Sequence, residues 1–267
     1  MKILIPVDFS KNSEKALQFA LNLIPEKRLD IILVHVVELV YDFASQAALA
    51  LDSMYKDAEK LIQRLQEKYE DDRVHLTGKV QEGTPSITLA RLAEQEAVSL
   101  IVMGTKGASG VKKVLIGTTA ANLVKESAVP VLLVPEEAKI KGITRLILAL
   151  EFEDHEENFI DWLYHFSTDW LAKPEVLHVQ TTLGFRERIL ALGFEHYIRD
   201  KFPAQASKIH LIESDEVNVG IEDFLNQEEN IMLAMCHSHR GIWHQLWAKS
   251  KSIEMAYHST VPLLIMV

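Results

Sequence analysis

The sequence predicts an α/β fold of two tandem, doubly wound domains, each with a five-stranded, mostly parallel sheet. The first observation behind this prediction is that short, continuously apolar runs alternate with longer segments that carry an apolar stripe. Such runs are typical of parallel strands covered on both faces, and such stripes are typical of helices that pack on a sheet. The second observation is that the alternation begins again halfway along the chain, and 267 residues leave room for two such domains.

The first half is expected to alternate strand and helix five times, with right-handed crossovers. One helix start is marked clearly by a turn at Gly83, a candidate N-cap at Thr84 and Pro85 at the first helical position. An alanine-rich arm is expected at residues 43–51, ahead of a long helix that starts near Met54. The other predicted elements are strands at 2–7, 30–37, 73–80, 100–103 and 129–134, and helices at 10–24, 86–96 and from residue 117 onward.

A polar stretch without apolar periodicity follows residue 135 and is typical of a linker. It divides the chain into predicted domains at residues 1–137 and 143–267. Two internal echoes support a repeat, because HVV at 35–37 resembles HVQ at 178–180, and SAVPVLLV at 127–134 resembles STVPLLIM at 259–266. Similar last strands favour an intramolecular pseudo-dimer of the two domains and also allow a homodimer. The second half is expected to contain strands at 145–152, 175–179, 208–213, 230–235 and 263–267, and helices at 158–171, 185–202 and 217–226.

Composition and charge limit the classes of function. The formal net charge is −10 and no block of lysine and arginine occurs, which argues against nucleic acid and anionic membranes as partners. No apolar run approaches the roughly 18 residues needed to cross a bilayer, and the first residues lack the pattern of a signal peptide. The single cysteine, Cys236, cannot form an intrachain disulfide. These features predict a cytoplasmic protein with small ligands.

The stretch at residues 98–119 carries the clearest functional pattern. An apolar strand is followed by Gly104 and Gly107, and Gly117 opens an amphipathic segment. Glycines let backbone N–H groups approach a bulky anion, and a helix start offers unpaired N–H groups and the positive end of the helix dipole. Ligands of doubly wound sheets bind beyond the carboxyl ends of the strands, where the strand order reverses. If the first and fourth strands are neighbours, Asp8 and this loop meet at one phosphate-binding edge.

These residues resemble the universal stress protein family, whose nucleotide-binding members carry Gly, two residues, Gly, nine residues, Gly and then Ser or Thr. Gly104, Gly107, Gly117 and Thr118 match this pattern at every position. PVDFS at residues 6–10, the HVV sequence and VPVLLV also fit. The resemblance implies a Rossmann-like fold of the adenine nucleotide alpha hydrolase type, with the strand order 3-2-1-4-5 in each domain. It also implies ATP or a related adenine nucleotide as ligand, which Mg²⁺ or Mn²⁺ would be able to accompany.

The resemblance also implies roles for individual residues. Asp8 and the backbone of Pro6 and Val7 would line the nucleoside pocket, and Val36 would flank the adenine. The hydroxyl of Thr118 would donate to a phosphate directly. The positions implied on the phosphate side are Met103, Gly104, Lys106, Gly107, Gly117, Thr118 and Thr119.

Elementary chemistry allows the same roles and also structural alternatives. A carboxylate such as Asp8 can accept from ribose hydroxyls or face a phosphate-bound cation, but it also suits a cap on the helix that begins near Lys11. Lys106, Lys112 and Lys113 add positive charge to the loop and equally suit a solvated surface.

The second half departs from the glycine pattern. One alignment of the two halves places Met235 and Ser238 at the first two motif glycines, and the other places Cys236 and His239 there. Glu151 matches the aspartate of the first strand and is longer. Side chains at these positions would keep a polyphosphate away from the backbone, so the second half is predicted not to bind ATP.

The same region holds a candidate metal site. Cys236, His237 and His239 combine thiolate and imidazole groups, which zinc prefers, although their spacing matches no recognised zinc signature. A loop that has lost its phosphate function and filled with polar residues is the alternative. The tryptophans at positions 162, 170, 243 and 247 have helical or near-helical spacing, which favours core or interface positions.

Catalysis is weakly supported, because the chain contains no phosphate-binding lysine loop, dinucleotide fingerprint or G-x-S-x-G elbow. The leading hypothesis is an ATP-binding universal stress protein in which the nucleotide acts as a conformational switch for stress-response regulation or scaffolding. Occupancy would order the arm at 43–51 and the glycine loop. One alternative is a slow ATP hydrolase or autophosphorylating protein that uses Asp8 with a divalent cation. The other is a nucleotide-free interaction or dimerisation scaffold.

Overall fold

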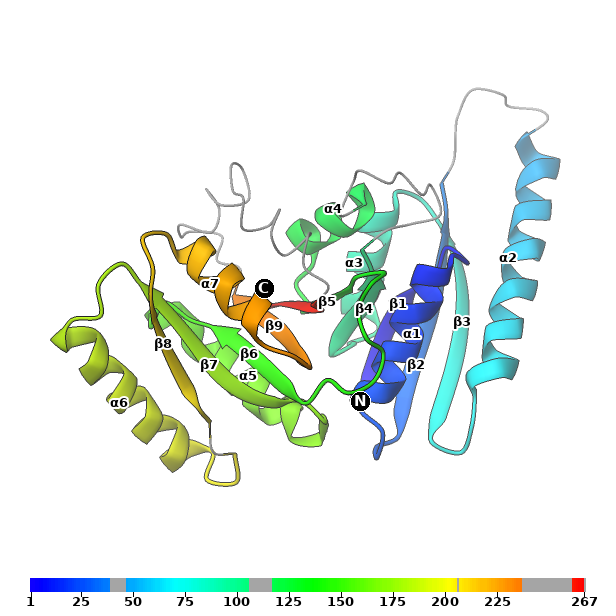
Figure 1. Ribbon diagram of the computed structural model, residues 1–267. Helices are drawn as coiled ribbons and strands as arrows, with labels where there is room; N and C mark the ends of the chain where they lie inside the picture. Colours follow the sequence, from blue (N-terminus) through cyan, green and yellow to red (C-terminus); the bar gives the residue numbers. More distant parts are fainter. Residues whose placement is uncertain (39–46, 106–116, 206, 237–260, 267) are drawn as a thin grey trace. The chain divides into compact units, whose positions relative to one another are not determined.

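The computed structural model describes residues 1–38, 47–105, 117–205, 207–236 and 261–266. The chain forms two compact units. The first comprises Met1–Ala20 and Glu26–Glu136, and the second comprises Glu137–Met266 together with Leu21–Pro25. In each unit a layer of strands is flanked by helices (Figure 1).

The first unit contains one parallel sheet. Its strands lie in the order β3-β2-β1-β4-β5, and every pairing between neighbours is parallel. The strand order predicted from the sequence is therefore confirmed for this half. The elements are β1 (Lys2–Pro6), α1 (Lys11–Leu23), β2 (Leu29–Val37), α2 (Ala47–Tyr69), β3 (Val74–Glu82), α3 (Pro85–Gln95), β4 (Leu100–Gly104), α4 (Thr118–Glu126) and β5 (Val131–Val134).

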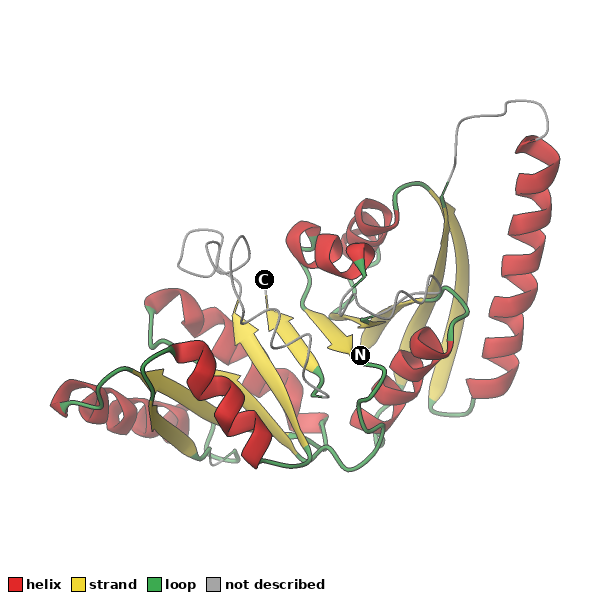
Figure 2. Ribbon diagram, turned by 45° about the horizontal axis from the view of Figure 1, so that its top comes forward, coloured by secondary structure: helices red, strands yellow, loops and turns green. Residues whose placement is uncertain are grey.

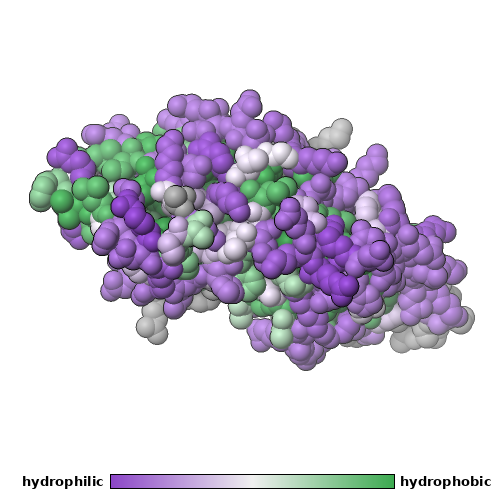
Figure 3. Space-filling model, turned by 90° about the horizontal axis from the view of Figure 1, so that it is seen from below, coloured by the Kyte–Doolittle hydropathy of each residue, from purple (hydrophilic) through white to green (hydrophobic). Residues whose placement is uncertain are grey.

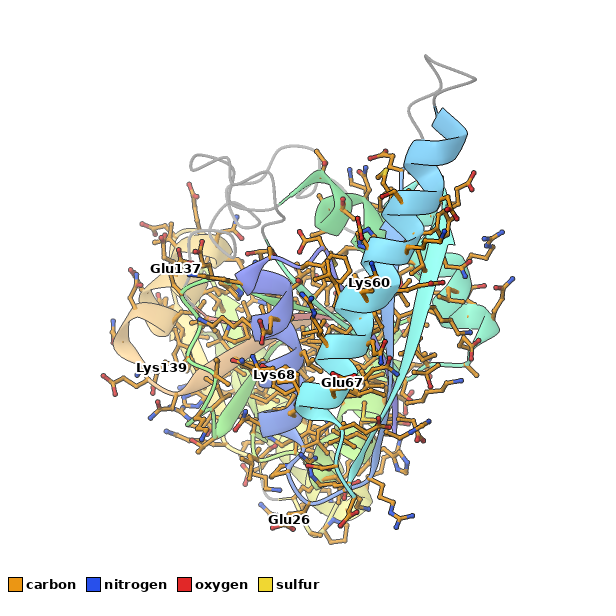
Figure 4. The ribbon with its side chains drawn as sticks, turned by 90° about the vertical axis from the view of Figure 1, so that its right-hand side faces the viewer. Glu26, Lys60, Glu67, Lys68, Glu137 and Lys139 are labelled. Carbon is orange, nitrogen blue, oxygen red and sulfur yellow. The ribbon has the colours of Figure 1, made fainter. Side chains whose placement is uncertain are left out.

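These strands form where apolar runs can be covered on both faces. The β1 residues Ile3 and Leu4 have no exposed surface, whereas β3 at the sheet edge is partly exposed. Right-handed crossovers place α1 and α2 on one face and α3 and α4 on the other. On the first of these faces Glu14 of α1 accepts hydrogen bonds from Lys68 and Tyr69 of α2, and both helices lie in front of the sheet in Figure 4.

Two local predictions for the first half need correction. The helix α2 begins at Ala47, so residues 47–51 are helical and do not form an arm; alanine and leucine are strong helix formers. The rest of the predicted arm lies outside the described residues. Thr84 is the N-cap of α3 and Pro85 follows it at the first helical position, as predicted. The side chain of Thr84 makes no capping hydrogen bond.

The second unit repeats the topology of the first. Its strands lie in the order β8-β7-β6-β9-β10 with parallel pairing throughout, which is again the order 3-2-1-4-5. Figure 2 draws the strands of both units as yellow arrows with red helices beside them. The elements are β6 (Arg145–Ala149), the 3-10 turn η1 (Asp154–Glu156), α5 (Glu157–Phe166), the 3-10 turn η2 (Ser167–Asp169), β7 (Lys173–Gln180), α6 (Phe185–Lys201), β8 (Ile209–Glu213), α7 (Val217–Gln227), β9 (Ile231–Cys236) and β10 (Leu263–Met266).

Two of the four tryptophans take part in packing beside α5, as predicted. Trp170 is buried, and Trp162 lies edge-on to it with the ring centroids 6.3 Å apart. Trp243 and Trp247 lie outside the described residues. No helix in the described part of the chain is long and apolar enough to cross a membrane.

Candidate functional site

The carboxyl ends of β1 and β4 lie side by side in the first unit. Ile3 is paired with Leu100 and Leu4 with Ile101, so these two strands are direct neighbours. The strand order reverses between them, because the chain passes from β1 to β2 on one side and from β4 to β5 on the other side. This arrangement meets the condition for a ligand-binding edge in a doubly wound sheet.

The backbone after β1 is held by two bonds to β2. The N–H of Val7 donates to the carbonyl of Val34 at 2.8 Å, and the carbonyl of Val7 lies 2.7 Å from Nδ1 of His35. Because a carbonyl oxygen can only accept, Nδ1 of His35 carries the hydrogen. The ring of Phe9 packs on the imidazole with the centroids 4.7 Å apart, and Phe9 itself has a φ of 61°. A left-handed residue of this size is uncommon and needs such support.

Sequence reasoning gave His35 no role. The signal was present in the repeated HV sequence at the end of the second strand of each half. The repetition could be recognised in the sequence, but the contact could not, because the Val7 carbonyl is far from His35 in the sequence.

Asp8 takes part in the turn before α1. Its Oδ1 accepts from the N–H of Ser10 at 3.0 Å, and the hydroxyl of Ser10 accepts from the N–H of Ser13 at 3.2 Å. The side chain that caps α1 is therefore that of Ser10, and Asp8 shapes the turn one step earlier. The helix cap that was the alternative prediction for Asp8 is therefore made by Ser10.

Gly104 ends β4 where the first turn of α1 approaches closely. A Cβ at this position would lie 2.6 Å from Nδ2 of Asn12 and 3.0 Å from the Asn12 carbonyl oxygen. Packing within the protein therefore favours glycine at this position. On either side of residues 106–116, the N–H of Gly117 donates to the carbonyl of Thr105 at 2.6 Å.

The helix α4 starts at the same edge. Its N-cap is Gly117, which has no side chain to cap the helix, and no acidic residue lies in its first turn. The first N–H groups, those of Thr118 and Thr119, are therefore not bonded by an N-cap side chain, and no acidic residue of the first turn neutralises the positive end of the helix dipole. An anion is the natural partner of such a helix start.

The structure brings together most of the predicted site residues. Val36 is half-buried near the end of β2, and Met103 is buried in β4. Lys106 and Gly107, together with the other loop lysines, lie outside the described residues. The residues found at or next to the common edge are Pro6, Val7, Asp8, Val36, Met103, Gly104, Gly117, Thr118 and Thr119.

The second unit repeats the loop after β1 but not its surroundings. Nδ1 of His178 lies 2.8 Å from the carbonyl of Leu150, Phe152 has a φ of 61°, and its ring lies 4.3 Å from the imidazole of His178 between centroids. The same loop is therefore built twice. Glu151 follows Leu150 as Asp8 follows Val7.

The register of the sheet decides between the two alignments of the halves. Gly104 is paired with Val134, the last residue of β5, and Cys236 is paired with Met266, the last residue of β10. Cys236 therefore occupies the place of Gly104, which is the second of the two alignments, and a side chain stands where the first motif glycine would be.

Negative groups surround that side chain. Glu156 is buried, and its carboxylate accepts from the N–H groups of Glu151 at 3.0 Å and Glu153 at 2.9 Å. Burial, and then the nearby charges of Glu156 and Glu151, raise the pKa of the Cys236 thiol above its ordinary value. The two carboxylates repel a polyphosphate, and the neutral thiol is a poor metal ligand.

The other two residues of the candidate metal site, His237 and His239, lie outside the described residues. Within the described ranges, no group of three or more histidine, cysteine, aspartate and glutamate side chains is placed to hold a metal ion.

Comparison with known proteins identifies the class. The model of the universal stress protein family matches residues 1–135, and the chain belongs to this family. The chain is similar to the universal stress protein MJ0531 of Methanocaldococcus jannaschii, with 29% identity over 143 residues that cover 52% of this chain and 84% of the relative. It is also similar to MJ0577 of the same organism, with 26% identity over 154 residues that cover 50% of this chain and 93% of the relative.

The tandem architecture also has a counterpart of known structure. A universal stress protein from Archaeoglobus fulgidus superimposes with a TM-score of 0.74 over 99% of this chain and 95% of its own, at 20% sequence identity. At that identity the likeness concerns the fold, which both halves share. The chain is thus a tandem universal stress protein whose glycine motif is complete in the first half alone.

Proposed function

We propose that the first domain binds ATP or a related adenine nucleotide and that the bound nucleotide acts as a conformational switch in stress-response regulation or scaffolding. The observation that carries the proposal is the meeting, at one sheet edge, of Asp8, the close-packed Gly104 and the uncapped start of α4. The glycine spacing from Gly104 to Thr118 adds the backbone donors of the family pattern.

The roles follow from the chemistry of each group. The N–H groups of Thr118 and Thr119 and the Thr118 hydroxyl suit phosphate oxygens. The Asp8 carboxylate suits ribose hydroxyls or a Mg²⁺ or Mn²⁺ ion carried by the phosphates. Val36 supplies an apolar side chain for the base. Residues 106–116 complete the phosphate side in this proposal.

The second domain is proposed to remain empty of nucleotide. Cys236 removes the close backbone approach that Gly104 allows, and Glu151 and Glu156 place negative charge beside it. The asymmetry predicts a stoichiometry of one nucleotide per chain, since the two domains share a fold but not a binding edge.

The experiment is mass spectrometry of the gently purified protein for bound nucleotide, followed by calorimetric titration with ATP. One ATP per chain is expected. Asp8→Asn keeps the oxygen that accepts from Ser10 but removes the charge, and it should weaken binding roughly tenfold. The matched variant Glu151→Gln should leave binding unchanged. If no nucleotide co-purifies and millimolar ATP gives no heat, or if two ATP bind per chain, the proposal is wrong.

The same preparation distinguishes a binding protein from a slow hydrolase. Steady phosphate release that depends on Asp8 and exceeds that of a Gly117→Lys variant would support the enzyme. Nucleotide that stays intact over many binding cycles would support the switch.

A further inference from the structure

Asn12, in the first turn of α1, is a polar residue that is almost completely buried. Its exposed fraction is 6%, although the residue before it, Lys11, is exposed. Hydrophilic residues cover most of the surface seen in Figure 3, and asparagine is mostly found at such surfaces. Burial of an amide costs free energy unless the amide makes specific contacts. The position of Asn12 therefore needs a reason.

The cap of α1 does not supply that reason. Asparagine near a helix start commonly acts as the N-cap. Here the hydroxyl of Ser10 accepts from the N–H of Ser13 at 3.2 Å, so the helix is capped without Asn12. Asparagine is also a weaker helix former than alanine. The reason has to lie in a contact of Asn12 outside its own helix.

The side chain of Asn12 packs directly on Gly104, the first glycine of the motif. A Cβ added to Gly104 would lie 2.6 Å from Nδ2 and 2.8 Å from Cγ of Asn12. These distances are shorter than a van der Waals contact, so the amide fills the space that a side chain at position 104 would need. Asn12 and Gly104 are therefore a matched pair between α1 and β4.

This contact joins the two sides of the proposed site. On the nucleoside side, Oδ1 of Asp8 accepts from the N–H of Ser10 in the turn that leads into α1. On the phosphate side, Gly104 precedes Thr105, whose carbonyl accepts from the N–H of Gly117 at the start of α4. A shift of α1 against the end of β4 would therefore move the Asp8 carboxylate relative to the start of α4.

The second unit keeps neither member of the pair. Cys236 takes the place of Gly104 in the register of the sheet. His155 takes the place of Asn12 when the loops after β1 and β6 are aligned. Both positions therefore differ between the half that is proposed to bind a nucleotide and the half that is proposed to remain empty.

We infer that Asn12 is a positioning residue, which fixes the turn that carries Asp8 against the end of β4 at Gly104. The nucleoside and the phosphates of one ligand then meet two sides at a constant separation. Two linked groups bind more tightly than the separate groups when their sites are held in place, and this gain is lost when the sites move against each other. The inference rests on the proposed function, because it needs a nucleotide that spans both sides.

Calorimetric titration of Asn12→Ala with ATP, adenosine and tripolyphosphate tests the positioning role, because adenosine and tripolyphosphate each engage one side only. Affinity for ATP should fall about tenfold, and affinity for each separate group should fall less than about twofold. The matched control is Ser13→Ala, since Ser13 is also 6% exposed and its hydroxyl donates within the same turn, to the Ser10 carbonyl at 3.0 Å. This variant should leave the affinity for ATP unchanged.

A double-mutant cycle tests the contact without any ligand. Gly104→Ala should lower the urea midpoint in the Asn12→Ala background by less than about half of what it does in the unaltered protein, because the amide that its Cβ meets is gone. Circular dichroism establishes that each variant is folded.

The outcomes separate this inference from the proposed function. If the unaltered protein binds ATP and Asn12→Ala binds it equally well, only the positioning role is wrong. Equal losses for ATP, adenosine and tripolyphosphate, or an undiminished effect of Gly104→Ala in the cycle, would also overturn it. An unaltered protein that binds no ATP would overturn both.

Discussion

Replacement of His35 by leucine tests whether the loop after β1 is held in place for the nucleotide. Nδ1 of His35 donates to the carbonyl of Val7 at 2.7 Å, and the imidazole supports the ring of Phe9. Leucine keeps an apolar side chain against Phe9 but has no donor. The bond from the N–H of Val7 to Val34 is untouched, so the strand stays paired while the carbonyl side of Val7 is released.

The cost can be worked out from that lost bond. A partly buried carbonyl left without its donor costs about 1–3 kcal/mol, a sizeable share of the roughly 5–15 kcal/mol that stabilise a domain. The melting temperature of the first domain should fall by roughly 3–10 °C. Since Val7 and Asp8 are proposed to line the nucleoside pocket, ATP affinity should fall about tenfold as well.

Two matched variants separate positioning from general stability. His35→Asn places an amide Nδ2 close to the position of Nδ1 and should recover most of the affinity. His178→Leu removes the equivalent bond to Leu150 and should destabilise the second domain without changing ATP affinity. Scanning calorimetry and titration with ATP are the assays. If His35→Leu lowers the melting temperature but binds ATP as the unaltered protein does, or if His35→Asn recovers nothing, the positioning role is refuted.

Three further predictions follow from the described contacts. Gly104→Ala should lower the free energy of unfolding by about 1–3 kcal/mol, because the new Cβ meets Asn12. The Cβ of Gly193→Ala in α6 meets nothing within 4 Å, so this variant should raise the free energy of unfolding by up to about 1 kcal/mol. Urea unfolding measures both values, and equal losses would refute the packing argument. The buried thiol of Cys236 should react with a thiol reagent at the rate of unfolding, and fast labelling of the folded protein would contradict its burial. Hydrogen bonds from Lys2 and Lys79 lower the pKa of Glu96 from 4.5 to about 2. The contribution of Glu96 to the stability of the folded state is therefore present above pH 4.5 and lost as the pH falls toward 2. Glu96→Gln should flatten the dependence of stability on pH between these two values.

Local patterns in the sequence were sufficient for the elements and their order. The continuous apolar runs of β1 and β4 predict buried parallel strands, because such runs are stable where both faces are covered. Gly83 and Pro85 locate the start of α3 because their backbone preferences are local properties. The spacing from Gly104 to Thr118 indicates an anion site for the same reason, and the repeated HV sequence indicates that the chain is a duplication.

The sequence alone therefore determined the fold class, the tandem repeat and the candidate phosphate loop. Only the tertiary structure showed the register in which β1 and β4 pair, that Cys236 takes the place of Gly104, and that His35 reaches the carbonyl of Val7. It also showed that Asn12 of α1 packs on Gly104 of β4, because periodicity reveals the faces of a helix but not which strand each of them meets. These features depend on contacts between residues far apart in the chain, and strand order and register decide those contacts.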